Sequence, residues 1–133
     1  MNKKILILSI FLIVAGVSLT AVCAADHDVN TPDGYKINND LTVKNQKVQF
    51  QGMDAIQTIY VLENGTDNIT LTTFDVDHLV DFTPSGGSVS KNIKNKDGIY
   101  QEKDGRYIFL YKDQDQFIQI DAPSEKLIEE VLP

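Results

Sequence analysis

The stretch DVDHLVDF, residues 75–82, holds the densest group of side chains that could do chemistry. It places Asp75, Asp77 and Asp81 close to His78 in the sequence. Carboxylate oxygens and an imidazole nitrogen can bind a divalent cation, and helical spacing would put Asp77 and Asp81 on one face beside His78. Because one helical turn rarely supplies a full coordination shell, we interpret the stretch as a solvated acidic turn. A divalent-metal-dependent function at this cluster is kept as an alternative.

Catalytic chemistry has few other candidates. A nucleophilic Ser, Thr or Cys needs a neighbouring base, and the chain has only two histidines, His27 and His78. His27 lies in a polar stretch and is expected to be solvated. The single cysteine, Cys23, belongs to an N-terminal segment that we expect to be removed. The sequence therefore predicts no catalytic residues, no cofactor and no enzymatic activity.

Two asparagines have the spacing of N-glycan acceptors. Asn64 begins the sequon Asn-Gly-Thr and Asn68 begins the sequon Asn-Ile-Thr. Both lie at or just after a predicted hairpin tip, where a protruding loop leaves room for a bulky glycan. The motif is short and common, so its use depends on the source organism.

A row of aromatic side chains is the remaining candidate for binding. In the run RYIFLYK, Tyr107, Phe109 and Tyr111 alternate with Ile108 and Leu110, so the three rings point to one side of a strand. Core packing is the interpretation that we favour. As an alternative, the aromatic face could carry a small apolar ligand or lipid.

The first residues predict export. Lys3 and Lys4 precede an apolar run from Ile5 to about Leu19, and small residues follow it, which is the pattern of a secretory signal peptide. We expect cleavage after Ala24, with Ala25 as the second possibility. An uncleaved N-terminal anchor is the alternative. The expected organisation is a signal peptide at 1–24, a flexible leader at 25–31 and one domain at 32–133, secreted or at the cell surface, with no stable membrane span after cleavage.

Charge excludes one class of partner. Removal of Lys3 and Lys4 with the signal would leave ten basic against 19 acidic side chains, a net charge near −9. Such a surface repels phosphate backbones, and the chain has no basic cluster with aromatic spacing. We therefore expect no nucleic-acid binding. The mature chain would also lack cysteine, so its core must fold without a disulfide.

The elements that must position these residues are mainly strands. Asn64-Gly65 predicts the turn of a central hairpin, and Asp104-Gly105 predicts another. Ser124 is a plausible N-cap for a short C-terminal helix that buries Leu127, Ile128 and Val131. These signals predict an α+β fold, an antiparallel sheet of about five to seven strands with the helix packed on one face. Further expectations are a turn near Asn45, a helical turn in 75–82, a long polar loop over 83–98 with a short strand near Ile93, and strands at 98–101, 106–112 and 117–121.

Three segments together resemble a known family. They are PDGYKI, TIYVLENGTDNITLT and KDGIYQEKDGRYIFLYKDQDQFIQIDAPSEKLIEEVL, which span most of residues 31–132. The pattern is similar to small extracytoplasmic domains of unknown function in exported proteins of methanogenic archaea and Gram-positive bacteria, which also form outer portions of anti-sigma-factor-like proteins. The resemblance implies a non-catalytic α+β domain and supplies no site residues. We expect an exported binding or structural module whose surface or extracellular partner is unknown.

Overall fold

An antiparallel sheet makes up most of the molecule. The computed structural model describes residues 29–79, 81, 84 and 86–133. Within these residues every pair of neighbouring strands is antiparallel. The elements are β1 (Lys36–Ile37), β2 (Val43–Phe50), β3 (Met53–Glu63), β4 (Asn68–Val76), β5 (Val89–Ile93), β6 (Lys96–Lys103), β7 (Arg106–Asp113), β8 (Gln116–Ala122) and α2 (Glu125–Val131).

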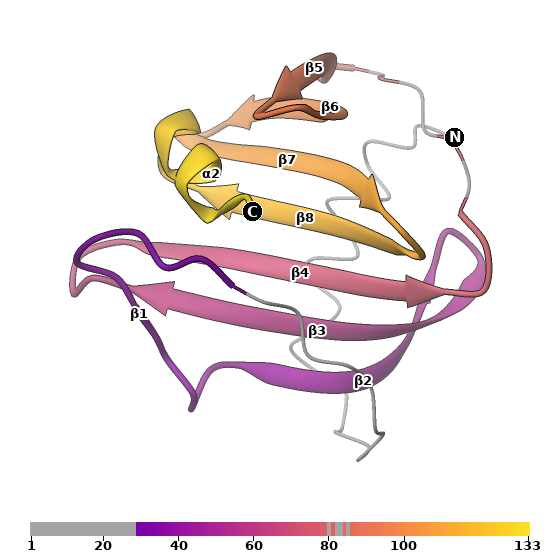
Figure 1. Ribbon diagram of the computed structural model, residues 1–133, viewed down its shortest axis with the longest axis horizontal. Coiled ribbons are helices and arrows are strands. Elements are labelled where there is room, and N and C mark those ends of the chain that lie inside the picture. Colours follow the sequence, from indigo (N-terminus) through magenta and orange to yellow (C-terminus); the bar gives the residue numbers. More distant parts are fainter. Residues whose placement is uncertain (1–28, 80, 82–83, 85) are drawn as a thin grey trace.

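The strand order divides the sheet into two halves. The order is β1-β3-β4-β8-β7-β6-β5, and β2 pairs with the part of β3 that β1 leaves free. The strands from β5 to β8 follow one another as a meander, and among the described strands the β4–β8 ladder is the one that joins this meander to β1–β4 (Figure 1). That junction pairs Thr70–Asp75 with Gln116–Asp121. It lies in the middle of the sheet.

Tight turns with positive φ explain how the strands reverse. Type I′ turns need two consecutive residues with positive φ, and they match the twist of the strands that they join. Three two-residue connections have this geometry: Gln51 and Gly52 with φ of 56° and 77°, Lys94 and Asn95 with 53° and 68°, and Asp104 and Gly105 with 53° and 78°.

One side of the sheet, which we call the helix face, carries the larger core. Phe109, Ile118 and Ile120 are completely buried there, and Ile128 of α2 is buried against the same cluster. The other side, the opposite face, carries a smaller cluster. Phe50 stacks on Phe74 with ring centroids 4.3 Å apart. The sheet is therefore apolar on both sides, as the strand 106–112 predicted.

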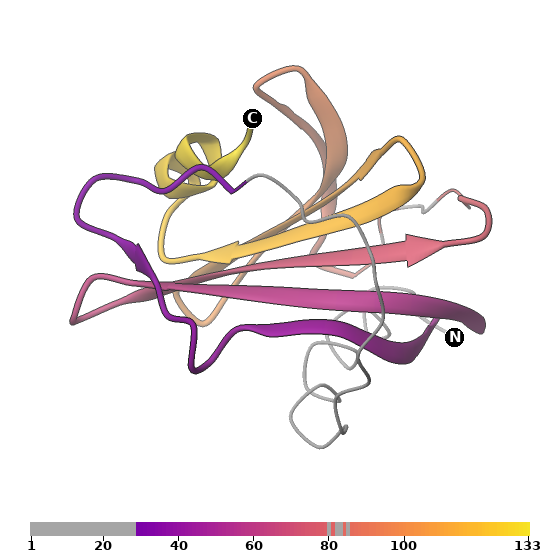
Figure 2. The same cartoon turned by 60° about the horizontal axis from the view of Figure 1, so that its bottom comes forward.

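The short helix is fixed at both ends. Ser124 Oγ accepts a hydrogen bond from the backbone nitrogen of Leu127 at 3.2 Å, which caps the first turn. At the other end, the Leu132 carbonyl accepts from Asn30 Nδ2 at 2.8 Å and from Lys94 Nζ at 3.0 Å. Figures 1 and 2 both show the segment before β1 running beside α2. A helix of this length needs such external contacts, because an isolated one is not stable in water.

The predicted class is confirmed and the predicted strand count is too low. An antiparallel sheet with a C-terminal helix is what the periodicity indicated, but the described residues form eight strands rather than five to seven. The count includes the two-residue β1 and also β5, which is the short strand expected near Ile93 and begins at Val89 in the stretch expected to be mostly loop. β5 lacks a clear alternating pattern, and its pairing with β6 stabilises it.

Two local predictions are wrong. Asn45 is a bulge rather than a turn: its φ is 56°, the register shifts beside it, and its backbone nitrogen bonds to Thr58 Oγ1 at 3.1 Å. The helical turn expected in 75–82 is not formed in the described part of that stretch. Asp75 pairs with Ile56 and with Gln116 inside the sheet, so β4 continues to Val76.

Several predictions concern residues outside the described part of the chain. These are the signal peptide at 1–24, the cleavage site beside Ala24, Cys23, His27 and the first residues of the leader at 25–31. In the described remainder of the leader, residues 29–31 form no strand or helix.

Candidate functional site

A groove opens on the helix face, beyond the part that α2 covers. It has a volume of about 780 Å³ and lies over β2, β3 and the end of β4. Lys47, Ile56 and Asp75 are paired in one row across the three strands. We call this groove the acidic groove. It is lined by Lys47, Val48, Gln49, Asp54, Ala55, Ile56, Asp75 and Asp77.

Three carboxylates and one ammonium group determine the chemistry of the acidic groove. Gln49 Nε2 donates a hydrogen bond to Asp54, and Gln116 Nε2 donates one to Asp75. Asp77 is exposed and has no hydrogen bond or ion pair within the described residues. The half-buried Ile56 provides an apolar surface between the acids. The groove can therefore hold a cationic group that has an apolar stem.

The four metal candidates are not brought together as a metal site. Asp75 and Asp77 both line the acidic groove, whereas Asp81 forms an ion pair with Lys112 of β7. His78 is exposed in the bend after β4. Among the described residues, no three His, Cys, Asp or Glu side chains lie close enough to one another to hold a metal ion. Asp77 and His78 lie in a bend, so the helical spacing that was expected to put Asp77 and Asp81 on one face is not formed in the described residues.

The aromatic row of β7 lies in the core of the helix face. Phe109 is completely buried and Tyr111 is 2% exposed, and their ring centroids are 5.6 Å apart. Tyr107 is half-buried, and its ring is tilted against that of Tyr100 with centroids 6.1 Å apart. Gly98 of β6 leaves room for Phe109, because a Cβ at that position would come within 2.8 Å of the ring. The two inner rings are thus in close contact with neighbouring strands.

Burial also affects one hydroxyl of this row. The Tyr111 hydroxyl is buried and forms no hydrogen bond with the described residues, and desolvation raises the pKa of Tyr111 far above its usual value. An unsatisfied buried hydroxyl lowers stability by about 1–3 kcal/mol. Tyr111 therefore contributes through its ring.

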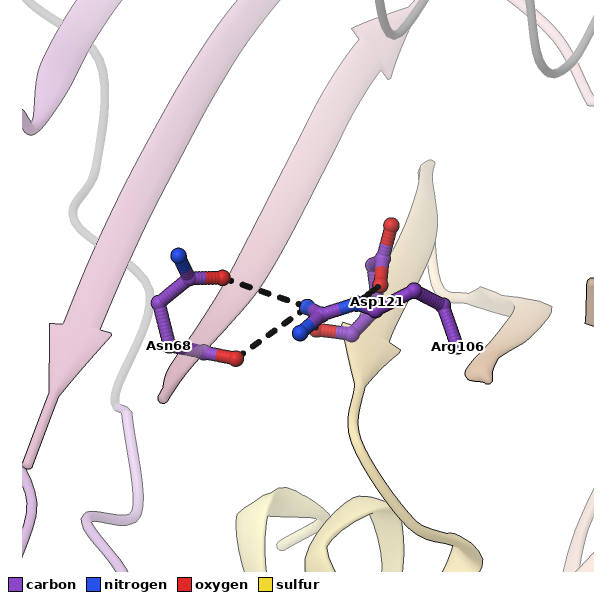
Figure 3. A network of polar contacts seen from close by, with 3 residues as sticks. All are labelled: Asn68, Arg106 and Asp121. Carbon is purple, nitrogen blue, oxygen red and sulfur yellow. Dashed lines mark hydrogen bonds and ion pairs between the residues drawn. The ribbon is translucent and has the colours of Figure 1, made fainter. Parts of the chain in front are cut away.

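The two sequons differ in their surroundings. Asn64 and Asn68 are both exposed, but Asn64 lies at the tip of the β3–β4 hairpin, whereas Asn68 is the first residue of β4 and contacts Arg106 (Figure 3). Arg106 Nε donates to Asp121 Oδ1 at 2.7 Å. Burial raises the pKa of Asp121 above its usual value, although the hydrogen bond and the positive charge of Arg106 act in the other direction. The network joins β4, β7 and β8.

Sequence reasoning missed two groups of polar residues. The acidic groove depends on the register of β2 against β3, and a turn at Asn45 would not have paired Lys47 with Ile56. The Gln51-Gly52 dipeptide was the signal that could have corrected this. On the opposite face, the side chain of Gln57 is buried. Within the part of the chain that the structure describes, neither of its polar atoms has a partner, and the Thr70 and Thr72 hydroxyls are also unsatisfied. Alternation alone does not distinguish such buried polar positions from exposed ones.

Comparison with known proteins gives no relative for the chain. No family model, no curated protein and no solved structure matches it. In the described part of the chain, no helix has the length and apolar character needed to cross a membrane.

Proposed function

We propose that the protein is an exported, non-catalytic binding module of the cell surface or extracellular space, and that the acidic groove holds its partner. Support for export comes from Lys3, Lys4 and the apolar run that follows them. Support for a non-catalytic role comes from His78, which is exposed and, within the described residues, has no hydrogen-bond partner to orient it as a base. The resemblance to small extracytoplasmic domains agrees with both.

The acidic groove is the observation that carries the proposal. Asp54, Asp75 and Asp77 surround Ile56, and Lys47 is the one cation among the described lining residues. Asp77 has no partner within the chain's described residues, so it is available to pair with a ligand. A partner that presents lysine, arginine or amine groups on apolar stems would complement this arrangement. The net charge of the mature chain would attract such a partner over a longer range.

Titration of the exported form with an oligolysine peptide tests the proposal. We expect backbone amide NMR shifts to move at Lys47, Asp54, Ile56 and Asp77, and the affinity to fall as salt is added, because exposed charge pairs are screened. Replacing both Asp75 and Asp77 by Asn should weaken binding about twofold to thirtyfold, since each charge pair near the surface contributes about 0.2–1 kcal/mol.

A double variant with the same charge change elsewhere is the control. Asp33 and Asp40 are exposed and lie outside the groove, so Asp33→Asn with Asp40→Asn should keep the affinity. Equal weakening by both double variants would mean that net charge alone attracts the peptide. Shifts confined to the opposite face around Gln57 and Thr72 would place the binding surface there and refute the groove.

A further inference from the structure

We infer that Asn64 is the acceptor of an N-linked sugar in the folded protein and that Asn68 is not. The inference rests on the proposed export, because sugar transfer to a sequon asparagine takes place in secreted proteins. Sequence alone presents the two sequons as equivalent. Their hydrogen bonds and their places in the hairpin make them different.

The carboxamide of Asn64 is already oriented for transfer. Its Oδ1 accepts three hydrogen bonds across the hairpin tip: from the Thr66 nitrogen at 2.9 Å, from Thr66 Oγ1 at 3.1 Å and from the Asp67 nitrogen at 2.7 Å. Nδ2 has no partner within the described residues. The oxygen is thus held over the turn, while the nitrogen that must form the new bond stays accessible.

The tip also has space for a sugar and for the enzyme that transfers it. Residues 64–67 are all exposed. A Cβ built at Gly65 would meet no atom within 4 Å. Both residues that define the sequon, Asn64 and Thr66, lie in this exposed turn, so an enzyme can contact them together without moving a strand.

Asn68 is exposed as well, but its contacts and its place in a strand differ (Figure 3). Arg106 Nη2 donates to its side-chain oxygen at 3.2 Å and to its backbone oxygen at 3.1 Å. The Thr70 hydroxyl, which completes this sequon, is buried in the sheet. Thr70 is also paired with Val61 on one side and Asp121 on the other. An enzyme could reach Asn68 and Thr70 together only if β4 left the sheet.

The chemistry requires an activated sugar donor, a lipid-linked pyrophosphate oligosaccharide. A bond forms between Nδ2 of Asn64 and C1 of the first sugar, and the bond between C1 and the phosphate oxygen breaks. The lipid pyrophosphate leaves with the bonding electrons, and the proton lost from Nδ2 goes to a base of the transferase. No oxidant or reductant takes part.

The test gives the purified, folded full chain to an oligosaccharyl transferase with this donor, and glycopeptide mass spectrometry measures each site. A peptide of residues 60–73, which holds both sequons without the sheet, is the reference. We expect both asparagines of the peptide to be modified. In the folded chain Asn68 should be modified about tenfold more slowly than Asn64 or not at all, because it must wait for local unfolding. Asn64→Gln should remove the product and Asn68→Gln should keep it.

The outcomes separate this inference from the proposed export. Equal rates at Asn64 and Asn68 in the folded chain would overturn it. So would a folded chain that stays unmodified at Asn64 while the peptide accepts sugar there, or a peptide that accepts none at either site. The reaction uses purified protein and does not depend on secretion, so a failure of export in cells would refute the proposed function and leave the acceptor result standing.

Discussion

At the residue scale, the rings of β7 contribute most through packing. Phe109 is completely buried between Gly98, Tyr111 and the residues beneath α2. A folded chain of this size with no disulfide has few large side chains to lose. The effect of replacing Phe109 on stability therefore shows whether Phe109 is a core residue or lines a ligand site.

Replacing Phe109 by Ala should lower the free energy of unfolding by about 3–5 kcal/mol, because it removes the ring and leaves a cavity. Tyr111→Phe is the matched control on the same strand. It keeps the ring and removes the unsatisfied hydroxyl, so stability should stay the same or rise. Urea unfolding of both variants measures the difference. A Phe109→Ala protein that kept its stability and lost uptake of an apolar dye would favour the carrier alternative.

The alternating pattern in the sequence predicted which of these residues lie on the same face of the sheet. It did not predict their contacts. Tyr107, Phe109 and Tyr111 do share the helix face. The missing partner of the Tyr111 hydroxyl and the pairing of Arg106 with Asp121 depend on which strands become neighbours. Period-two spacing carries no information about that choice.

At the element scale, Arg106 holds three strands together. Its guanidinium contacts Asn68 of β4 and Asp121 of β8 from its own place on β7 (Figure 3). The ion pair is partly buried, with side-chain exposures of 32% and 10%. Removing one partner of such a pair leaves the other charge without compensation.

Arg106→Met should therefore lower the free energy of unfolding by about 1.5–3 kcal/mol near neutral pH, the value typical of hydrogen bonds to charged groups. Burial already raises the pKa of Asp121, and loss of Arg106 should raise it further. A carboxyl whose pKa is higher in the folded state binds its proton more tightly there, so its penalty is absent at low pH and grows as pH rises through the folded pKa. The deficit should be largest near neutral pH and should shrink on acidification.

Urea unfolding at about pH 7 and at about pH 4, close to the ordinary carboxyl pKa, measures this change. Lys103→Met is the control, because Lys103 is paired with Arg106 across the β6–β7 turn, is exposed and forms no ion pair in the described part of the chain. It should have little effect at either pH. An equal deficit of Arg106→Met at both pH values would mean that Arg106 acts through packing.

Hairpins whose turns contain residues that favour positive φ could be predicted from the sequence. Hairpins without such residues could not. Asn64-Gly65 and Asp104-Gly105 located two reversals, because asparagine, aspartate and glycine tolerate positive φ. Lys94 also has positive φ, at 53°, which lysine seldom adopts, so the β5–β6 hairpin was missed. The end of β4 was misjudged for a related reason: the apolar spacing after Asp75 fits a helix, but pairing with Ile56 and Gln116 keeps this residue in the sheet.

At the scale of the whole molecule, the proposed function and sugar transfer to Asn64 both depend on export. Lys3, Lys4 and the apolar run predict that the chain is secreted and cut after Ala24, or after Ala25. Intact-mass analysis of secreted material should therefore find a chain that starts at Ala25 or Asp26. A chain that stays in the cytoplasm with Met1 retained would refute the proposed function and remove the setting for sugar transfer to Asn64.

The fold class followed from composition and hairpin signals, but the arrangement of the strands did not. The central pairing of β4 with β8 joins residues 70–75 to residues 116–121, and a single sequence carries no local signal for a contact at that separation. The acidic groove was missed for the same reason, because its residues come together only when β2, β3 and β4 are aligned.

Among the described strands, the β4–β8 ladder is the one strand pairing between residues 36–76 and residues 89–122. Asn30 with Leu132 and Arg106 with Asn68 add side-chain contacts between the two parts. In the described chain, the strand ladders on either side of β4 and β8 join neighbours in sequence or remain within residues 36–76. A break between Val76 and Val89 would thus leave every hairpin intact and cut no strand. Two molecules could exchange their β5–α2 halves by reforming the β4–β8 ladder between them, which is domain swapping. The same architecture suits reconstitution from two separately produced fragments.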